Sequence, residues 1–224
     1  VPTIKDVGTK TVKVRATNPN YDAAETEYTL TVTAREVELT ADSDSKAYNG
    51  TPLTNSGYSI TKGSFVDGEG LASVTVEGSQ TDVGSSDNTI TGHTLTPATL
   101  AKNYTITYVK GTLTVTASSE LTVEGTDYNN TYDGASHGEA ATASVTEGTT
   151  ISYSVDNGAT WTTTVPTIKD AGTVKVTVKA ENPNYQTAQN TYTLTVSPRA
   201  IELTAASDSK AYNGTPLTNS GYSI

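Results

Sequence analysis

The chain has 224 residues, no cysteine and a formal net charge of −10. This acidity argues against nucleic acid or an anionic membrane as a partner, because both attract basic surfaces. The missing cysteines exclude disulfide bonds and thiolate metal sites within this sequence, and we expect no membrane span because no apolar run approaches the ~18–20 residues that a bilayer requires.

The sequence repeats itself. Residues 1–60 and 165–224 align without a gap and are identical at 44 of 60 positions, and Ser43–Ile60 recurs unchanged as Ser207–Ile224. The triplet Glu-Leu-Thr, which begins at residues 38, 120 and 202, divides the 164-residue period into two modules of 82 residues. Self-similarity at a fixed period is typical of modular arrays.

We therefore predict two complete modules and two partial ones. The complete modules span residues 36–117 (type A) and 118–198 (type B), residues 1–35 are the C-terminal part of a preceding module, and residues 199–224 are the N-terminal part of a further type A module. Neither partial module can bury a core alone, so we expect neighbouring copies along a filament to order both. Two arrangements remain open: a continuous fibre of which this chain is one part, or head-to-tail completion between molecules by strand pairing.

Alternation of apolar and polar residues with period two runs through almost the whole chain, which predicts an all-β fold. In residues 1–35 this pattern lies on either side of a turn at Asn18–Asn20 and predicts a hairpin or two neighbouring strands, whose apolar positions are Val12, Val14, Tyr28, Leu30 and Val32. In the type A module we place strands near 37–40, 57–62, 72–77, 88–95, 103–109 and 112–117. In the type B module we place them near 120–124, 140–146, 150–155, 160–164, 173–180 and 189–197.

Two turns are specified by glycine. Val109–Gly111 joins the last two predicted strands of the type A module, and Asp156–Gly158 is the clearest hairpin turn of the type B module. Only about two to four residues are left for the linker between residues 33 and 36, which predicts stiff junctions.

Several motifs in fixed order carry a resemblance. They are the ending NYTITYVKGTLTVT at 103–116, Tyr-Asn-Gly or Tyr-Asp-Gly beginning at Tyr48 and Tyr132, Asp-Val-Gly or Asp-Ala-Gly before a strand, and GATWTTTVPTIKDAG at 158–172. Together they resemble the mostly bacterial Ig-like (MBG) and YDG-type repeats. The resemblance covers essentially the whole chain and implies tandem Ig-like β-sandwich modules arranged end to end, in large surface proteins mainly of Gram-positive bacteria.

The resemblance implies a non-catalytic function outside the cell. We expect a structural stalk or fibre repeat of a bacterial cell-surface protein, whose partners are adjacent repeats of the same protein in a filament or long array. The alternative is an adhesin module that binds a glycan or a host protein along the array. We expect no enzyme activity and no cofactor, because the two histidines lie in different modules and no phosphate-binding loop or nucleophile elbow is present.

Four residues are candidates for a site. Trp161, with Tyr153, is a possible ligand platform, because an indole that follows a turn can stack on a sugar ring; the competing interpretation is a partly buried Trp covering a sheet edge. Lys46 and Lys210, beside Tyr-Asn-Gly, are candidates for an isopeptide cross-link, although exposed lysines at strand starts are far commoner.

Loop aspartates raise the possibility of a calcium site, since carboxylate oxygens suit a hard cation. Asp42, Asp44, Asp82 and Asp87 are the residues concerned. Their spacing fits no EF-hand loop, and Asp42 is replaced by Ala206 in the other copy. We therefore interpret them as solvated turn carboxylates and predict no metal site.

Overall fold

The computed structural model describes residues 1–224. The fold is all-β, as predicted, with 17 strands in small sheets. The only helical segment is a single turn of 3-10 helix, η1 (Ala101–Asn103), and the chain has no helix suited to crossing a membrane. The chain divides into two compact units, Val1–Ser118 and Ser119–Ile224.

Nine strands belong to the first unit. In chain order they are β1 (Gly8–Asn18), β2 (Tyr21–Val32), β3 (Arg35–Ala41), β4 (Asp44–Ala47), β5 (Tyr58–Gly63), β6 (Leu71–Glu77), β7 (Gly84–Leu95), β8 (Tyr104–Val109) and β9 (Gly111–Thr116).

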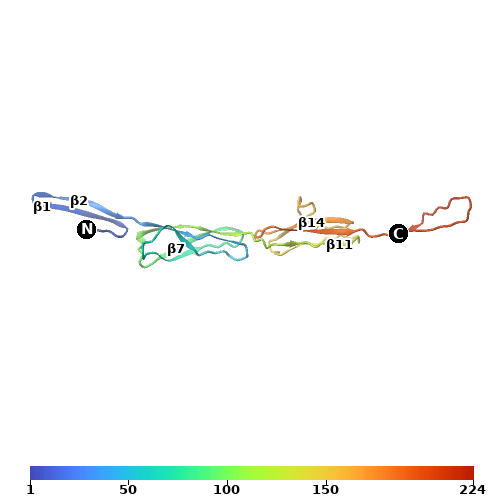
Figure 1. Cartoon of the computed structure of the whole chain (residues 1–224), viewed down its shortest axis with the longest axis horizontal. Coiled ribbons are helices and arrows are strands. Elements are labelled where there is room, and N and C mark those ends of the chain that lie inside the picture. Colours follow the sequence, from blue (N-terminus) through green and yellow to red (C-terminus); the bar gives the residue numbers. More distant parts are fainter. The chain divides into compact units, whose positions relative to one another are not determined.

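Strands β1 and β2 form the predicted hairpin around Asn18–Asn20, drawn at the blue end of the chain in Figure 1. They pair antiparallel, with Val12 opposite Tyr28 and Gly8 opposite Val32, and they form a sheet of two strands only. Both outer edges of this sheet therefore carry unpaired backbone groups.

The other strands of the first unit form two sheets, in the orders β5-β3-β8 and β4-β9-β7-β6. Side chains of both sheets meet in one apolar cluster, which consists of Val37, Leu39, Ala41, Ile90 and Tyr104. In β7 the fully buried side chain of Asn88 donates hydrogen bonds to the backbone oxygens of Asp42, at 2.8 Å, and Asn55, at 2.9 Å. These bonds join the two loops on either side of β4 to the middle of the second sheet.

The sequence prediction of the first unit was wrong in two places. It missed β4, which pairs in parallel with β9, because the residues Asp44–Ala47 are almost all polar and the strand is held by its backbone. It also joined β8 and β9 in one turn, whereas the two strands lie in different sheets and only Lys110 separates them. The crossing requires glycine at 111, since a Cβ there would lie 2.4 Å from the backbone oxygen of Asp42.

Eight strands belong to the second unit. They are β10 (Val123–Glu124), β11 (Tyr128–Thr131), β12 (Thr142–Ala143), β13 (Thr150–Ser154), β14 (Gly172–Glu181), β15 (Ala188–Ser197), β16 (Thr204–Ala205) and β17 (Tyr222–Ser223). Four of them form a sheet in the order β11-β15-β14-β13, β10 pairs with β12, and β16 pairs with β17.

The second unit also departs from its predicted strands. β11 was missed for the same reason as β4: its residues Tyr128–Thr131 show no apolar alternation, and it pairs in parallel with β15. The strand predicted at 160–164 is absent, and only Thr162 forms an isolated bridge, with Tyr153. The loop before it is held instead by hydrogen bonds of Asp156, which are described below.

Two hairpins of similar sequence occur in this chain, in different surroundings. β14 and β15 repeat β1 and β2 in the same register, with Val176 opposite Tyr192 as Val12 is opposite Tyr28. In the second unit β10, β11, β12 and β13 cover this hairpin, so that Val178 is 0% exposed; its counterpart Val14 is 44% exposed. The apolar face of β1–β2 is thus only partly covered, since Val12 is buried while Val14 and Tyr28 are more than 40% exposed.

This contrast predicts the effect of shortening Leu194, which is completely buried in β15. Leu194→Ala leaves a cavity in the core, and we expect it to lower the free energy of unfolding of the second unit by about 2–5 kcal/mol. Trp161 is the only Trp, so its fluorescence during urea unfolding follows this unit alone.

The matched control is Leu30→Ala, the same position of the repeated hairpin, where the side chain is half-buried. We expect it to leave the Trp161 transition unchanged and to cost less in its own unit, as hydrogen exchange would show. Equal losses at both positions would contradict this account of the two hairpins.

Candidate functional site

Hydrogen bonds of Asn103 with Asp6 and Val7, which we call the latch, lie where the β1–β2 hairpin joins the rest of the first unit. Only Thr33 and Ala34 separate β2 from β3. The side chain of Asn103, at the end of η1, accepts a hydrogen bond from the backbone nitrogen of Val7 at 2.9 Å and donates one to Asp6 at 3.1 Å. The bond from Asn103 lowers the pKa of Asp6, and Lys102, 3.5 Å away, contributes in the same direction.

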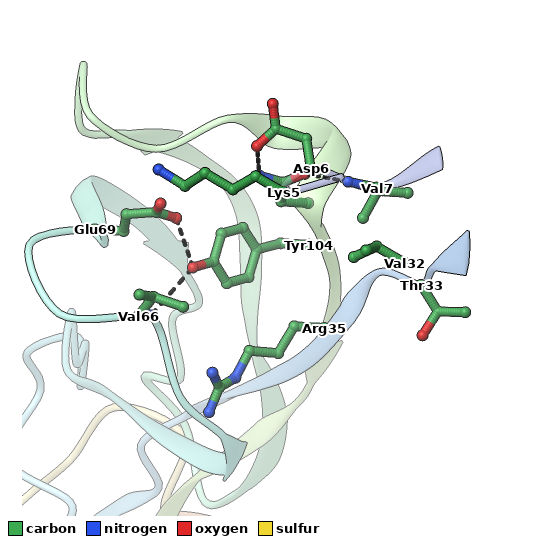
Figure 2. A pocket seen from close by; sticks show the side chains of 10 residues that line it. Lys5, Asp6, Val7, Val32, Thr33, Arg35, Val66, Glu69 and Tyr104 are labelled. Atoms are coloured by element: carbon green, nitrogen blue, oxygen red, sulfur yellow. Dashed lines mark hydrogen bonds between the residues drawn. The ribbon is translucent and has the colours of Figure 1, made fainter. Parts of the chain in front are cut away.

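A small cavity of about 180 Å³ lies beside this latch, and Figure 2 shows the side chains around it. The hydroxyl of Tyr104 points at the loop opposite, donates to Glu69 at 2.6 Å and accepts from the backbone nitrogen of Val66 at 3.1 Å. Burial, followed by the hydrogen bond to Glu69, raises the pKa of Tyr104. The polar groups around Tyr104 are thus already engaged with one another, which is the arrangement of a structural junction.

The recurring Tyr-Asn-Gly or Tyr-Asp-Gly motif is a turn closed by its own side chain. Asn49 Oδ1 accepts from the backbone nitrogen of Thr51 at 3.1 Å, and Asp133 Oδ1 accepts from that of Ala135 at 2.9 Å. The glycine between them has a positive φ in both cases, 77° at Gly50 and 83° at Gly134. Such a turn needs Asn or Asp followed by a residue free to adopt the left-handed region, which accounts for the motif.

The two candidate cross-link lysines lie at these turns. Lys46 Nζ donates to Asn49 Oδ1 at 2.8 Å and to the backbone oxygen of Thr51 at 2.6 Å. Lys210 Nζ donates to Thr215 Oγ1 at 2.7 Å and to the backbone oxygen of Pro216 at 2.9 Å. Each ammonium thus binds the turn that follows it, outside the buried core, whereas an isopeptide bond of this kind would need the lysine, an amide partner and an acid to meet in the core.

The two residues proposed as a ligand platform are placed differently. Tyr153 is only 3% exposed and its hydroxyl accepts a hydrogen bond from the backbone of Ala141, so this ring belongs to the core and presents no face to a ligand. Trp161 is half-buried, and Lys179 Nζ on β14 lies 4.6 Å from its ring centroid. A cation–π contact therefore occupies one face of the indole.

Asp156 organises the loop before Trp161. It accepts hydrogen bonds from Ser154 Oγ at 2.6 Å, from the backbone nitrogen of Thr160 at 2.9 Å and from Thr160 Oγ1 at 2.6 Å. These bonds, with that of Ser154 the strongest, lower the pKa of Asp156 to about 2. The predicted turn is present, with positive φ at Asn157 and Gly158.

No group of three or more His, Asp or Glu side chains lies together in a way that would hold a metal ion. His137 donates to Asp133 at 2.9 Å and stacks on Tyr128 with ring centroids 4.5 Å apart. That hydrogen bond lowers the pKa of Asp133. The contacts of His137 with Asp133 and Tyr128 thus connect the Tyr-Asp-Gly turn to β11.

The chain matches no protein-family model, and no curated protein is significantly similar to it. The resemblance to MBG and YDG-type repeats thus depends on the quoted motifs. Sequence reasoning missed the latch, although both of its halves are repeated motifs: Asp-Val-Gly at 6–8 recurs at 82–84, and Asn-Tyr at 103–104 recurs at 184–185. The recurrence of these two motifs is the sequence signal from which the latch could have been predicted.

The pKa of Asp156 predicts a pH dependence. Since the folded value of about 2 lies below the usual 3.8, ionised Asp156 stabilises the fold above about pH 4, and this contribution disappears as the pH falls toward 2. We expect Asp156→Asn to destabilise the second unit at neutral pH and to reduce its loss of stability between these two pH values. The measurement is thermal unfolding followed by Trp161 fluorescence.

Asp170→Asn, at an exposed loop residue of the same unit, serves as the control and should preserve the normal acid dependence. If Asp156→Asn unfolds with the same acid dependence as the unmodified chain, the side chain does not stabilise the loop in the way described.

Proposed function

We propose that this chain is a structural stalk or fibre repeat of a bacterial cell-surface protein, located outside the cell and built of tandem Ig-like β-sandwich modules. The modules span residues 36–117 and 118–198, with parts of further modules at 1–35 and 199–224. The motif resemblance supports the family and the location. One observation of the fold supports a load-bearing function in particular.

That observation is the parallel pairing of early and late strands. In the first unit β4 pairs in parallel with β9, which is the last strand, over four residues from Asp44 opposite Leu113 to Ala47 opposite Thr116. In the second unit β11 pairs in parallel with β15, from Tyr128 opposite Leu194 to Thr131 opposite Ser197. Both modules thus join a strand near their start to the strand at their end.

Parallel pairing matters because of the direction in which tension acts. When a chain is pulled from its two ends, the early strand is drawn one way and the last strand the other, along the line of both strands. All the hydrogen bonds between them then bear the load together, whereas an antiparallel hairpin pulled at its open end loses its bonds one at a time. The bonds of a parallel pair are evenly spaced and share such a load well. A stalk needs this resistance at every module.

The prediction concerns Tyr132, whose backbone nitrogen donates to the backbone oxygen of Ser197 at 2.8 Å, at the end of the β11–β15 pair. Tyr132→Pro removes this donor, and we expect it to lower the unfolding force of one of two events when single molecules are pulled by their ends. That event should release about 250 Å of chain, since an extended residue spans ~3.3–3.6 Å.

The control is Tyr132→Ala, which loses the same side chain and keeps the nitrogen donor. It should retain the higher force, and neither variant should alter the other event. Equal forces for the proline and alanine variants would show that the parallel pair does not bear the load.

The alternative is an adhesin module that binds a glycan or a host protein, and the half-exposed Trp161 is the residue that favours it. Its free ring face is the surface available for stacking on a sugar, since Lys179 occupies the other. If the stalk function is the whole function, the chain should bind no glycan on an array. Binding that Trp161→Ala abolishes, and that Val155→Ala at a nearby exposed position preserves, would favour the adhesin instead.

A further inference from the structure

Three Asn-Gly pairs occur in this chain, at Asn49–Gly50, Asn157–Gly158 and Asn213–Gly214. Such a pair can modify itself, because no side chain shields the glycine nitrogen, which can attack Cγ of the Asn. The new N–C bond closes a succinimide ring, the Cγ–Nδ2 bond breaks, and the amide leaves as ammonia with the proton of the glycine nitrogen. Water then opens the ring at one of its two carbonyls and leaves either Asp or isoaspartate.

Ring closure requires two groups to be free. The Asn side chain must turn so that Cγ faces the glycine nitrogen, and that nitrogen must give up its proton and form the new bond. A hydrogen bond that fixes either group therefore slows the reaction. The structure contains both kinds of bond, the first at Asn49 and the second at Gly158.

At the first turn the Asn side chain is fixed. Asn49 Oδ1 accepts hydrogen bonds from Lys46 Nζ at 2.8 Å, from the backbone nitrogen of Thr51 at 3.1 Å and from Thr51 Oγ1 at 2.8 Å. Lys46 Nζ also donates to the backbone oxygen of Thr51 at 2.6 Å, so the ammonium ties the Asn side chain to the far end of the turn. Rotation of the Asn49 amide toward Gly50 would have to lengthen or break these bonds together.

At the second turn the glycine nitrogen is fixed instead. The backbone nitrogen of Gly158 donates to Ser154 Oγ at 2.8 Å, and the Ser154 hydroxyl donates to Asp156 Oδ1 at 2.6 Å. An ionised carboxylate only accepts, so the hydroxyl proton goes to Asp156 and the oxygen is left to accept from Gly158. Ser154 is 2% exposed, and water therefore does not compete for this bond.

The turn at Tyr132–Gly134 shows which product would do harm. Asp133 occupies the place of Asn49 there, and its Oδ1 accepts from the backbone nitrogen of Ala135 at 2.9 Å, so an Asp in this position keeps the turn. In isoaspartate the main chain runs through the former side chain, and no side-chain oxygen is left to close the turn in this way. Protection against ring closure thus preserves the turn itself.

We propose that these hydrogen bonds protect the two turns against chemical modification: Lys46 and Thr51 fix the side chain of Asn49, and Ser154 fixes the nitrogen of Gly158. Lys46 then has a function that involves no cross-link. This inference depends on the bonds within each turn and not on the proposed stalk function, so either can fail without the other.

The test is ageing of the full-length chain at mildly alkaline pH, where the glycine nitrogen loses its proton more readily. Peptide mapping by mass spectrometry follows each Asn through the mass gained when oxygen replaces the amide nitrogen. The reference is the same chain in urea, which removes both turns. We expect Asn49 and Asn157 to react at least about tenfold more slowly in the folded chain, which is the factor for the loss of one or two hydrogen bonds.

Two variants should act on one turn each. Lys46→Ala should raise the rate at Asn49 about tenfold and leave Asn157 unchanged, whereas Ser154→Ala should raise the rate at Asn157 about three- to tenfold and leave Asn49 unchanged. Each variant is the control for the other, because a general loss of structure would raise both rates. Lys62→Ala, at another lysine of the first unit that binds a carboxylate, should match the unmodified chain at both turns.

Lys46→Arg keeps a donor at this position and should retain most of the protection of Asn49. Folded rates equal to those in urea would overturn the proposal. So would a rate at Asn49 that does not rise in Lys46→Ala, a rate at Asn157 that does not rise in Ser154→Ala, or either variant raising both rates together.

Discussion

Every long hairpin of this chain has one apolar side, and the fold depends on covering it. In the second unit the strands from β10 to β13 do so, and the core residues Val176, Val178 and Leu194 lose all contact with solvent. The related hairpin β1–β2 keeps the same strand pairing with less of this cover. Backbone hydrogen bonds thus define the hairpin, whereas the burial that stabilises it must come from the strands that precede it in a module.

Alternation of side chains was enough to predict the all-β fold and the long strands, because residues such as Val176 and Leu194 are buried and identify the inner face. It could not predict β4 or β11, since strands held by their backbone at a sheet edge leave no apolar pattern. The site was less predictable still. Tyr153 and Trp161 look equivalent in sequence as aromatic residues near one turn, yet Tyr153 completes the core and Trp161 packs against Lys179.

The two units reach similar arrangements with different chemistry. The fourth residue after Gly84 is Asn88, whose buried amide bonds two loop carbonyls, whereas the fourth residue after Gly172 is Val176, which packs in an apolar core. The turn after the early edge strand is held by Lys46 in one type and by the His137–Asp133 pair in the other. Only the second unit depends on carboxylate ionisation at this turn, so acid acts on the turns of the two units unequally.

The identical turn at Asn49–Thr51 and Asn213–Thr215 occupies the same point of the module in both copies. It lies within 18 residues of unbroken identity, Ser43–Ile60 and Ser207–Ile224. Recombination between the coding sequences of these two stretches would add or remove a whole period of 164 residues and would leave every hydrogen bond of the turn in place.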